Sequence, residues 1–225
     1  MKEVLVFIPA FNEESYLPKL LDSIETVNFE KIGFKKEIII VDDGSSDNTL
    51  KLAKKAVSDI PAAKVFHQNN QGKGKAVQKG ISEASGEFVI VQDADLEYDP
   101  QDYKQMLMQI NERNCVYGSR ILGQIHYFNR IFPFPGKHPN QSFGSWCAGV
   151  ILSFSVFLMY RTWITDTLTA YKLYPRDTIT NMNVVTHGFE TDHEITAKLI
   201  KNGMKITEVP IHYSPRTIEQ GKKIC

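Results

Sequence analysis

The sequence predicts an α/β fold in which helices cover both faces of a parallel sheet. Strand-like runs alternate with helix-like stretches through the first half of the 225 residues, which is the pattern of βαβ units. The strand runs are almost continuously apolar and rich in Val and Ile, as in parallel sheets buried on both faces. Three polar motifs directly follow strand runs, and ligands of such sheets bind beyond the carboxyl ends of the strands.

The elements of the first half follow from this alternation. Strands are expected at 3–9, 37–43, 63–68, 87–93 and 115–119, with helices between them at 13–26, 47–58, 73–84 and 100–112. Asp47 or Ser46 is placed to cap the second of these helices, and Asp99 the fourth, which has Pro100 in its first turn.

The second half is less regular. Residues 121–145 are rich in aromatic residues, Pro and Gly, and an apolar run follows from Trp146 to Tyr160. Beyond it we expect a short strand within 169–175, a helix near 190–202 and a strand over 204–211. A 15-residue helix is about 22 Å long, whereas the hydrocarbon core of a bilayer is about 30 Å thick. The apolar run therefore predicts either a buried helix or one lying in a membrane interface.

Composition narrows the class of protein. The length suits a single domain, and 26 basic residues balance 26 acidic ones, so net charge gives no reason to expect nucleic acid as a partner. The three cysteines are widely spaced and fit neither a disulfide framework nor a zinc site, which indicates a reducing compartment. The N-terminus begins Met-Lys-Glu and runs into a strand, so no signal peptide is expected.

Two motifs at strand ends suit a nucleotide. "VDDGSSDNT" (41–49) is either a polar turn with a helix cap or a carboxylate that accepts hydrogen bonds from a base or ribose. In the second case, Gly44 would let the backbone approach the ligand closely. "NNQGKGKA" (69–76) is no phosphate-binding P-loop, but it places Lys73 and Lys75 at the start of a helix, where they suit phosphate or sugar.

A third motif, "DADLE", gathers carboxylates after a strand. Asp93, Asp95 and Glu97 alternate in sequence, so in an extended segment they would share one side. Three such carboxylates repel one another unless a cation neutralises them, and oxygen ligands suit Mg²⁺ or Mn²⁺. A solvated acidic turn is the alternative.

The order of these motifs carries a family resemblance. "IPAFNEE", "VDDGSSDNT", "NNQGKGKA", "DADLE" and "GSR" resemble the inverting glycosyltransferases of family 2, which have the GT-A fold. "TDTLTAYKLY", "EVPIHYSPR" and "EQGKKI" are similar to segments of dolichol-phosphate mannosyltransferases and their bacterial polyprenyl-phosphate relatives. The resemblance implies a mixed, mainly parallel sheet in one domain, 1–225. Residues 1–120 would bind the nucleotide sugar, and 121–225 would face the acceptor and the membrane with a short apolar helix.

The resemblance also implies roles for single residues. Pro9, Phe11 and Glu13 would line the nucleotide pocket, Asp43 would contact the base, and Lys73 and Asp93 would bind the nucleotide sugar. Asp93, Asp95 and Glu97 match the metal and diphosphate segment, with Glu97 in place of a glutamine common in the mannosyltransferases. The expected catalytic residues are Asp95, Asp166, Arg120 and Arg216. Arg120, Arg216, Lys222 and Lys223 would hold the acceptor phosphate.

The resemblance implies transfer of a hexose, mannose or glucose, from a GDP- or UDP-sugar to a polyprenyl or dolichyl phosphate. The transfer would invert the sugar, use Mg²⁺ or Mn²⁺, and take place on a peripheral protein at the cytoplasmic face of a membrane. Two alternatives remain open. One is a family 2 enzyme acting on a sugar hydroxyl, with Asp192 or Glu194 as the base. The other is a membrane-associated protein that binds a nucleotide sugar without turnover.

Overall fold

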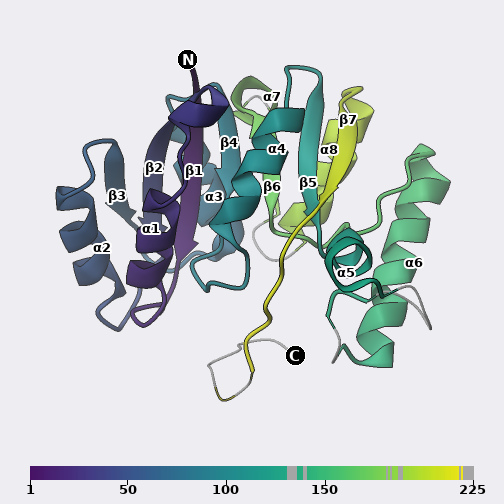
Figure 1. Ribbon diagram of the computed structural model, residues 1–225, viewed down its shortest axis with the longest axis horizontal. Helices are drawn as coiled ribbons and strands as arrows, with labels where there is room; N and C mark the ends of the chain where they lie inside the picture. The colour runs from purple at the N-terminus through teal and green to yellow at the C-terminus, as the bar shows by residue number, and fades with distance from the viewer. Residues whose placement is uncertain are drawn as a thin grey trace.

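A seven-stranded sheet forms the centre of the protein (Figure 1). This computed structural model describes residues 1–130, 136–138, 141–180, 182, 184–186, 190–217 and 219. The strand order is β3-β2-β1-β4-β6-β5-β7. The strands are β1 (Lys2–Ala10), β2 (Phe34–Asp42), β3 (Ala63–His67), β4 (Phe88–Val91), β5 (Asn114–Ser119), β6 (Lys172–Pro175) and β7 (Lys205–Pro210). Each of these strands lies within or overlaps a run that the sequence predicts as a strand.

One strand makes the sheet mixed. β1 pairs in parallel with β2 and β4, β2 with β3, and β5 with β7, whereas β6 is antiparallel to both of its neighbours. The expectation of a mixed, mainly parallel sheet is confirmed. Because Ala10 pairs with Asp42 at the ends of β1 and β2, the polar segments that follow these two strands begin side by side.

Helices cover both faces of this sheet. They are α1 (Leu17–Glu25), α2 (Thr49–Ser58), α3 (Lys73–Ser82), α4 (Tyr103–Gln109), α5 (Arg120–Phe128), α6 (Phe143–Tyr160), α7 (Arg176–Thr180) and α8 (Thr191–Lys201), with 3-10 turns η1 (Glu30–Ile32) and η2 (Pro100–Asp102). The helix expected over 100–112 is therefore η2 followed by α4. Asp99 caps η2 as predicted, because its side chain accepts from the Gln101 N–H. The Asp47 side chain accepts from the Thr49 N–H at the start of α2, whose N-cap is Asn48.

Two helices are not evident in the sequence. α5 begins directly after β5, where the Ser119 hydroxyl accepts from the Leu122 N–H, and it ends at Asn129 in a left-handed conformation. Its aromatic and glycine residues obscure a helical pattern. α7 is only five residues long, too short for periodicity to show. Both helices connect the strands of the second half of the sheet.

Two apolar cores lie on the two faces of the sheet, and alternate side chains of β1 divide between them. Val4, Val6 and Ile8 pack in the core covered by α1, α2 and α4. Leu5 and Phe7 pack in the core covered by α3, α7 and α8. This period of two is the signature of a strand buried on both faces.

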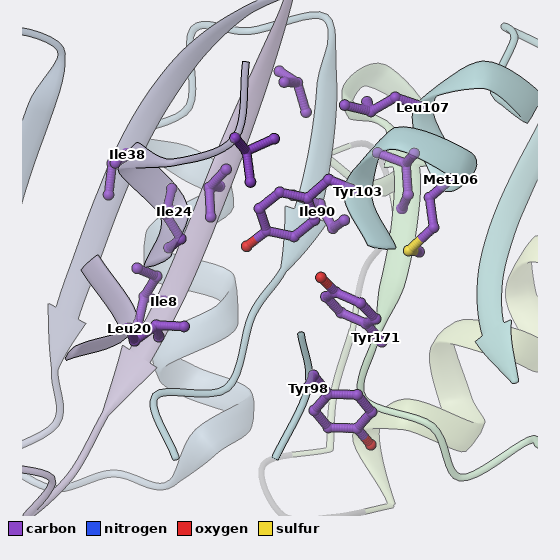
Figure 2. Packing of buried hydrophobic residues seen from close by; sticks show 14 of the residues in the cluster. Ile8, Leu20, Ile24, Ile38, Ile90, Tyr98, Tyr103, Met106, Leu107 and Tyr171 are labelled. Carbon is purple, nitrogen blue, oxygen red and sulfur yellow. The ribbon is translucent and has the colours of Figure 1, made fainter. Parts of the chain in front are cut away.

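Tyrosines extend the first core toward the end of β4 (Figure 2). The ring of Tyr171 lies 5.7 Å from that of Tyr103 and 5.1 Å from that of Tyr98, and Tyr98 lies 5.2 Å from Tyr213. The hydroxyls find partners in Gln92 Oε1 and the Asp99 carbonyl. These buried rings support the turn that carries the acidic motif.

The apolar helix α6 stands apart from the sheet (Figure 1). It runs for 18 residues, has a mean hydropathy of 1.6, and has 6% of its residues buried. By length and composition it is the one helix in the described part of the chain that could cross a membrane. It is longer than the 15 residues expected, and at about 1.5 Å per residue it spans about 27 Å. A buried core helix, one of the two expectations, is excluded by its exposure.

Candidate active site

A cavity of 940 Å³ opens where β1, β2 and β4 end. The start of α6, the start of α8 and the segment after β7 complete its walls. Most of the residues expected in the site line it, namely Pro9, Phe11, Glu13, Asp43, Lys73, Asp93, Asp95, Glu97, Arg120 and Arg216. The fold thus brings together residues from both halves of the chain. Asp166 is not among the lining residues, and Lys222 and Lys223 lie outside the described residues.

Asp43 is held by the loop that precedes α3. Its Oδ1 accepts from Gln68 Nε2 at 2.8 Å and from the Gln71 N–H at 2.9 Å, and its Oδ2 accepts from the Gly72 N–H at 2.9 Å. A carboxylate has about four acceptor positions, so one remains for a ligand. Its proposed contact with a base stays a prediction.

Gly44 allows a close approach between two segments of the protein. Its φ is +75°, and a Cβ at this position would lie 2.7 Å from the backbone nitrogen of Asn70. The glycine therefore lets the loop before α3 pack against the end of β2. In this structure the close approach is between two protein segments.

The acidic motif forms a turn, which corrects the expected extended segment. Leu96 has a left-handed φ of 58°, and Asp95 Oδ1 accepts from the Glu97 N–H at 3.2 Å. The side chains still converge on the cavity, because the turn brings them to one wall. Among the described residues, however, no three His, Cys, Asp or Glu side chains are arranged to hold a metal ion.

Each carboxylate of this turn has a protein partner, and Asp95 and Glu97 share Arg216. Asp93 pairs with Lys73 Nζ at 2.7 Å. Glu97 accepts from the Tyr213 hydroxyl at 2.6 Å and from the Arg216 N–H at 2.9 Å. Asp95 lies 3.2 Å from Arg216 Nη2, yet burial, together with the charges of Asp93 and Glu97, raises its pKa to about 7. The turn therefore holds more negative charge than its protein partners neutralise.

Arg216 joins the C-terminal segment to this turn. Its guanidinium lies 3.0 Å from Glu13 Oε2 through Nη1 and 3.8 Å from Glu97 Oε1 through Nε, and it stacks 4.9 Å from the Tyr16 ring. The Nε is buried and has no hydrogen-bond partner among the described residues. Arg216 thus meets the carboxylates expected to face the donor, although the sequence assigned it to the acceptor.

Arg120, which also lines the cavity, forms an ion pair with Asp166. Nε lies 2.7 Å from Oδ2, Nη2 lies 2.8 Å from Oδ1, and the Arg120 N–H also donates to Oδ2. Burial alone would raise the pKa of Asp166, but Arg120 holds it below its usual value. Glu208 accepts from the N–H groups of Thr165 and Asp166, which fixes this loop. Asp166 therefore orients an arginine.

The sequence did not single out three residues of the site. Lys137 lines the cavity next to Ser142 and Ser145 at the start of α6, and burial, with the charge of Arg120, lowers its pKa to about 8. Lys172 is fully buried in β6 and bonds Asp192 Oδ1 at 2.9 Å. Tyr213 bonds Glu97. A lysine inside an apolar strand needs a buried partner, so the position of Lys172 in the sequence could have predicted a buried ion pair. Lys137 lies in an irregular segment, and nothing in the sequence around it predicts a role.

The two carboxylates named as alternative bases lie in different places. Asp192 lines the cavity. Glu194 accepts from the N–H groups of Val185 and Thr186 and pairs with Lys198, and it is not among the lining residues.

Several known proteins resemble this chain in sequence. Residues 5–163 match glycosyl transferase family 2. A dolichyl-phosphate beta-glucosyltransferase of Trichomonas vaginalis is 30% identical over 222 residues, which cover 92% of this chain and 64% of the relative. An undecaprenyl-phosphate 4-deoxy-4-formamido-L-arabinose transferase of Proteus mirabilis is 34% identical over 123 residues, 53% of this chain and 37% of the relative. The chain thus spans less than two thirds of either enzyme.

One solved structure is similar over nearly the whole chain. It is the glucosyl-3-phosphoglycerate synthase from Mycobacterium tuberculosis in complex with Mn²⁺, uridine diphosphate and phosphoglyceric acid. The two chains share 18% identity with a TM-score of 0.68, over 97% of this chain and 73% of the synthase. At this identity the likeness concerns the fold alone.

Proposed function

Because this chain belongs to glycosyl transferase family 2, we propose that it transfers a hexose from a nucleotide sugar to a polyprenyl phosphate and inverts the anomeric carbon. Two relatives whose names specify a dolichyl or undecaprenyl phosphate support this acceptor class. Glucose or mannose is the proposed sugar, carried on UDP or GDP. The similar synthase structure holds uridine diphosphate.

The donor diphosphate would lie at the acidic turn with a divalent cation. Mg²⁺ is usually bound by one or two carboxylates plus substrate phosphates, so a preformed set of three protein ligands is not required. Asp93 and Asp95 supply oxygen ligands, and the raised pKa of Asp95 indicates a place where added positive charge is favourable. Bound there, Mg²⁺ or Mn²⁺ would neutralise the leaving nucleoside diphosphate. Lys73 would add a cation on the same side.

The acceptor phosphate would lie between Arg120 and Lys137, which line the same cavity. Arg120 uses Nε and Nη2 on Asp166, which leaves Nη1 to face a ligand. The serine-rich start of α6 lines the same wall. Arg216 would lie at the boundary between this phosphate and the diphosphate. Lys222 and Lys223 remain predicted acceptor contacts outside the described residues.

The choice of a phosphate over a hydroxyl acceptor rests on the state of the carboxylates. A hydroxyl needs a general base, and the best base has a pKa near the working pH. Asp166 is held by Arg120, and Asp192 by Lys172, so that both pKa values lie below the usual range despite burial. Neither is suited to take a proton, and Asp95, whose pKa is raised to about 7, is proposed as a ligand of the cation and not as a base. A phosphate monoester has a second pKa of about 6 and is mostly dianionic at pH 7, so it needs no base.

Membrane binding would occur through α6, on a peripheral protein at the cytoplasmic face. Exposed Ile151, Phe154, Leu158 and Met159 form an apolar surface. The opposite side is held by the protein, because Ser153 is buried and donates to the Thr165 carbonyl, and Val156 packs on the second core. Where Ser153 and Val156 contact the rest of the protein, lipid cannot surround the helix. We infer that it lies in the interface, where one end reaches the acceptor phosphate.

A lipid-transfer assay tests this function. Purified protein is incubated with undecaprenyl or dolichyl phosphate, Mg²⁺ or Mn²⁺, and labelled UDP-glucose or GDP-mannose, and the organic phase is counted. A labelled lipid that releases sugar in mild acid supports the proposal. Label transferred only to a sugar hydroxyl, or nucleotide-sugar binding with no transfer to any lipid, would contradict it.

A further inference from the structure

Four charged side chains of alternating sign connect the cavity with the buried interior of the sheet. Asp93 pairs with Lys73 at 2.7 Å. The negative charges of Asp93 and Asp192 both raise the pKa of Lys73 and so favour its charged form. Asp192 pairs with Lys172. The first three side chains line the cavity, whereas Lys172 is not among its lining residues. The series therefore ends on a lysine that a ligand cannot reach.

Lys172 is fully enclosed in the strand between β4 and β5. Its exposure is 0%, its Nζ donates to Asp192 Oδ1 at 2.9 Å and to the Asp192 carbonyl at 3.3 Å, and it stands 4.9 Å from the Tyr117 ring. A buried ammonium is costly unless it is paired. Both oxygens that accept hydrogen bonds from the Lys172 ammonium belong to Asp192, in the first turn of α8. Lys172, on β6, therefore fixes the position of Asp192.

Asp192 lines the cavity, and one of its two carboxylate oxygens is available to accept a hydrogen bond there. Its side chain is 23% exposed, and its bond to Lys172 uses Oδ1, so Oδ2 can accept from a ligand. Lys73 neighbours it on the diphosphate side. An ionised carboxylate accepts hydrogen bonds and donates none. In a site for a nucleotide sugar, the donors that such a group recognises are sugar hydroxyls.

We propose that Lys172 is a positioning residue that fixes Asp192 as an ionised acceptor for hydroxyl groups of the transferred hexose. The proposal rests on the proposed function, because it names a contact to the sugar of that donor. It assigns Asp192 to sugar binding, and it makes the interaction depend on a lysine that touches neither substrate.

Binding measurements separate the sugar from the nucleotide. Calorimetry compares UDP with UDP-glucose and GDP with GDP-mannose on the wild-type protein, on Lys172→Met and on Asp192→Asn. A hydrogen bond to a charged group is worth roughly a 10- to 100-fold change in affinity. We expect each variant to lose about that much affinity for the nucleotide sugar, with a change under about threefold for the free nucleoside diphosphate.

A double variant tests whether Lys172 acts through Asp192. If it does, Lys172→Met combined with Asp192→Asn loses no more affinity than Asp192→Asn alone, because residues that act as a unit are not additive. The double variant also removes both buried charges, so it should fold where one single variant fails. Lys64→Met is the control, because Lys64 pairs with Glu37 at 3.0 Å away from the cavity. It should leave all four affinities unchanged.

Two results would overturn the inference. Equal losses for the nucleoside diphosphate and the nucleotide sugar would place the pair at the diphosphate. Additive losses in the double variant would mean that Lys172 does not act through Asp192. If the wild-type protein binds neither nucleotide sugar, the proposed function fails as well, and that outcome is recognised before any variant is measured.

Discussion

Arg120 and Asp166 form an ion pair with two side-chain hydrogen bonds, Nε–Oδ2 at 2.7 Å and Nη2–Oδ1 at 2.8 Å. The Asp166 side chain is 0% exposed. The pair joins the first residue of α5 to the loop before β6, and it aims an arginine at the cavity. Asp166, which the sequence analysis expects to be catalytic, thus holds another side chain in place, and its loss should affect stability as well as turnover.

Asp166→Asn should destabilise the protein by about 3–5 kcal/mol, because it leaves a buried arginine without its charge partner. Urea unfolding followed by circular dichroism measures this. Asp177→Asn is the matched control, since Asp177 pairs with Arg176 at 3.4 Å with a side chain that is 85% exposed. An exposed pair is worth about 0–1 kcal/mol. Equal effects of the two changes would show that the buried pair is not a support.

The same pair predicts how stability depends on pH. The folded pKa of Asp166 is lowered, so the unfolded state binds its proton more readily. The contribution is therefore present above the unfolded pKa of about 3.9 and is lost as pH falls through the folded value. The difference in unfolding free energy between wild type and Asp166→Asn should shrink in this acidic range. A difference that stays constant from pH 7 to pH 3 would contradict the assignment.

Asp95→Asn should abolish transfer while the protein stays folded. The ionised form of Asp95 is disfavoured by burial and by Asp93 and Glu97, so a neutral side chain of the same size should leave the melting temperature unchanged or raise it. Excess chelator should likewise stop turnover of the wild type. Full activity of the variant, or of the wild type in chelator, would rule out the metal site at this turn.

Lys137→Met should raise the KM for polyprenyl phosphate by about tenfold or more, because it removes a charge-assisted contact to the acceptor. Affinity for the nucleotide sugar should not change. With a pKa of about 8, the wild-type lysine loses its charge above that pH, so kcat/KM for the acceptor should fall there. Lys137→Arg should keep its charge, so its kcat/KM should not fall at alkaline pH. If kcat/KM falls in the same way in wild type and Lys137→Arg, the fall is caused by another group.

Arg216→Lys keeps a charge and loses the fork that spans Glu13 and Asp95. If Arg216 grips the acceptor phosphate, the variant should raise the KM for polyprenyl phosphate or lower turnover, with donor binding and liposome flotation nearly unchanged. Steady-state kinetics with each substrate varied in turn decides this. Loss of donor affinity with normal acceptor kinetics would place the arginine at the diphosphate.

Replacement of Ile151, Phe154 and Leu158 by Ser should release the protein from liposomes in a flotation assay. These side chains are 54–63% exposed and face away from the protein, so the fold should persist. Leu152 and Phe157 are poorer choices, because both are partly buried. Met108→Ser changes an apolar side chain on α4 with 69% exposure and serves as the control. Unchanged flotation of the triple variant would exclude this face as the membrane contact.

The fold was largely predictable because its signals are local. Val4, Val6 and Ile8 alternate with Leu5 and Phe7 in a continuous apolar run, which is what a strand buried on both faces requires. The likeness to a solved structure at a TM-score of 0.68 confirms the GT-A type of fold. α5 was not predicted, because its glycine and aromatic residues have low helix propensity. These residues suit the segments on which the helix packs, and packing overrides local propensity.

The site was predictable in part. Asp43 and Asp93 follow buried strands, and parallel strands end at one edge, so sequence order alone brings them together. Lys137 and Asp192 belong to the same cavity only because the chain returns from the second half of the sheet. Whether Asp166 is free to act as a base or is held in an ion pair depends on its distance from Arg120. The spacing of residues in the sequence does not determine that distance.

The sequence by itself determined the strands, the two apolar faces, the family and the end of the sheet that carries the chemistry, since each follows from patterns within a short segment. Only the tertiary structure decided which charges are paired. Lys172 and Asp192 stand 20 residues apart, and Arg216 lies 121 residues from Asp95. Such pairs form where the packing of the sheet excludes water. Burial and distance, which are properties of the folded chain, then determine which carboxylates stay ionised and what each can bind.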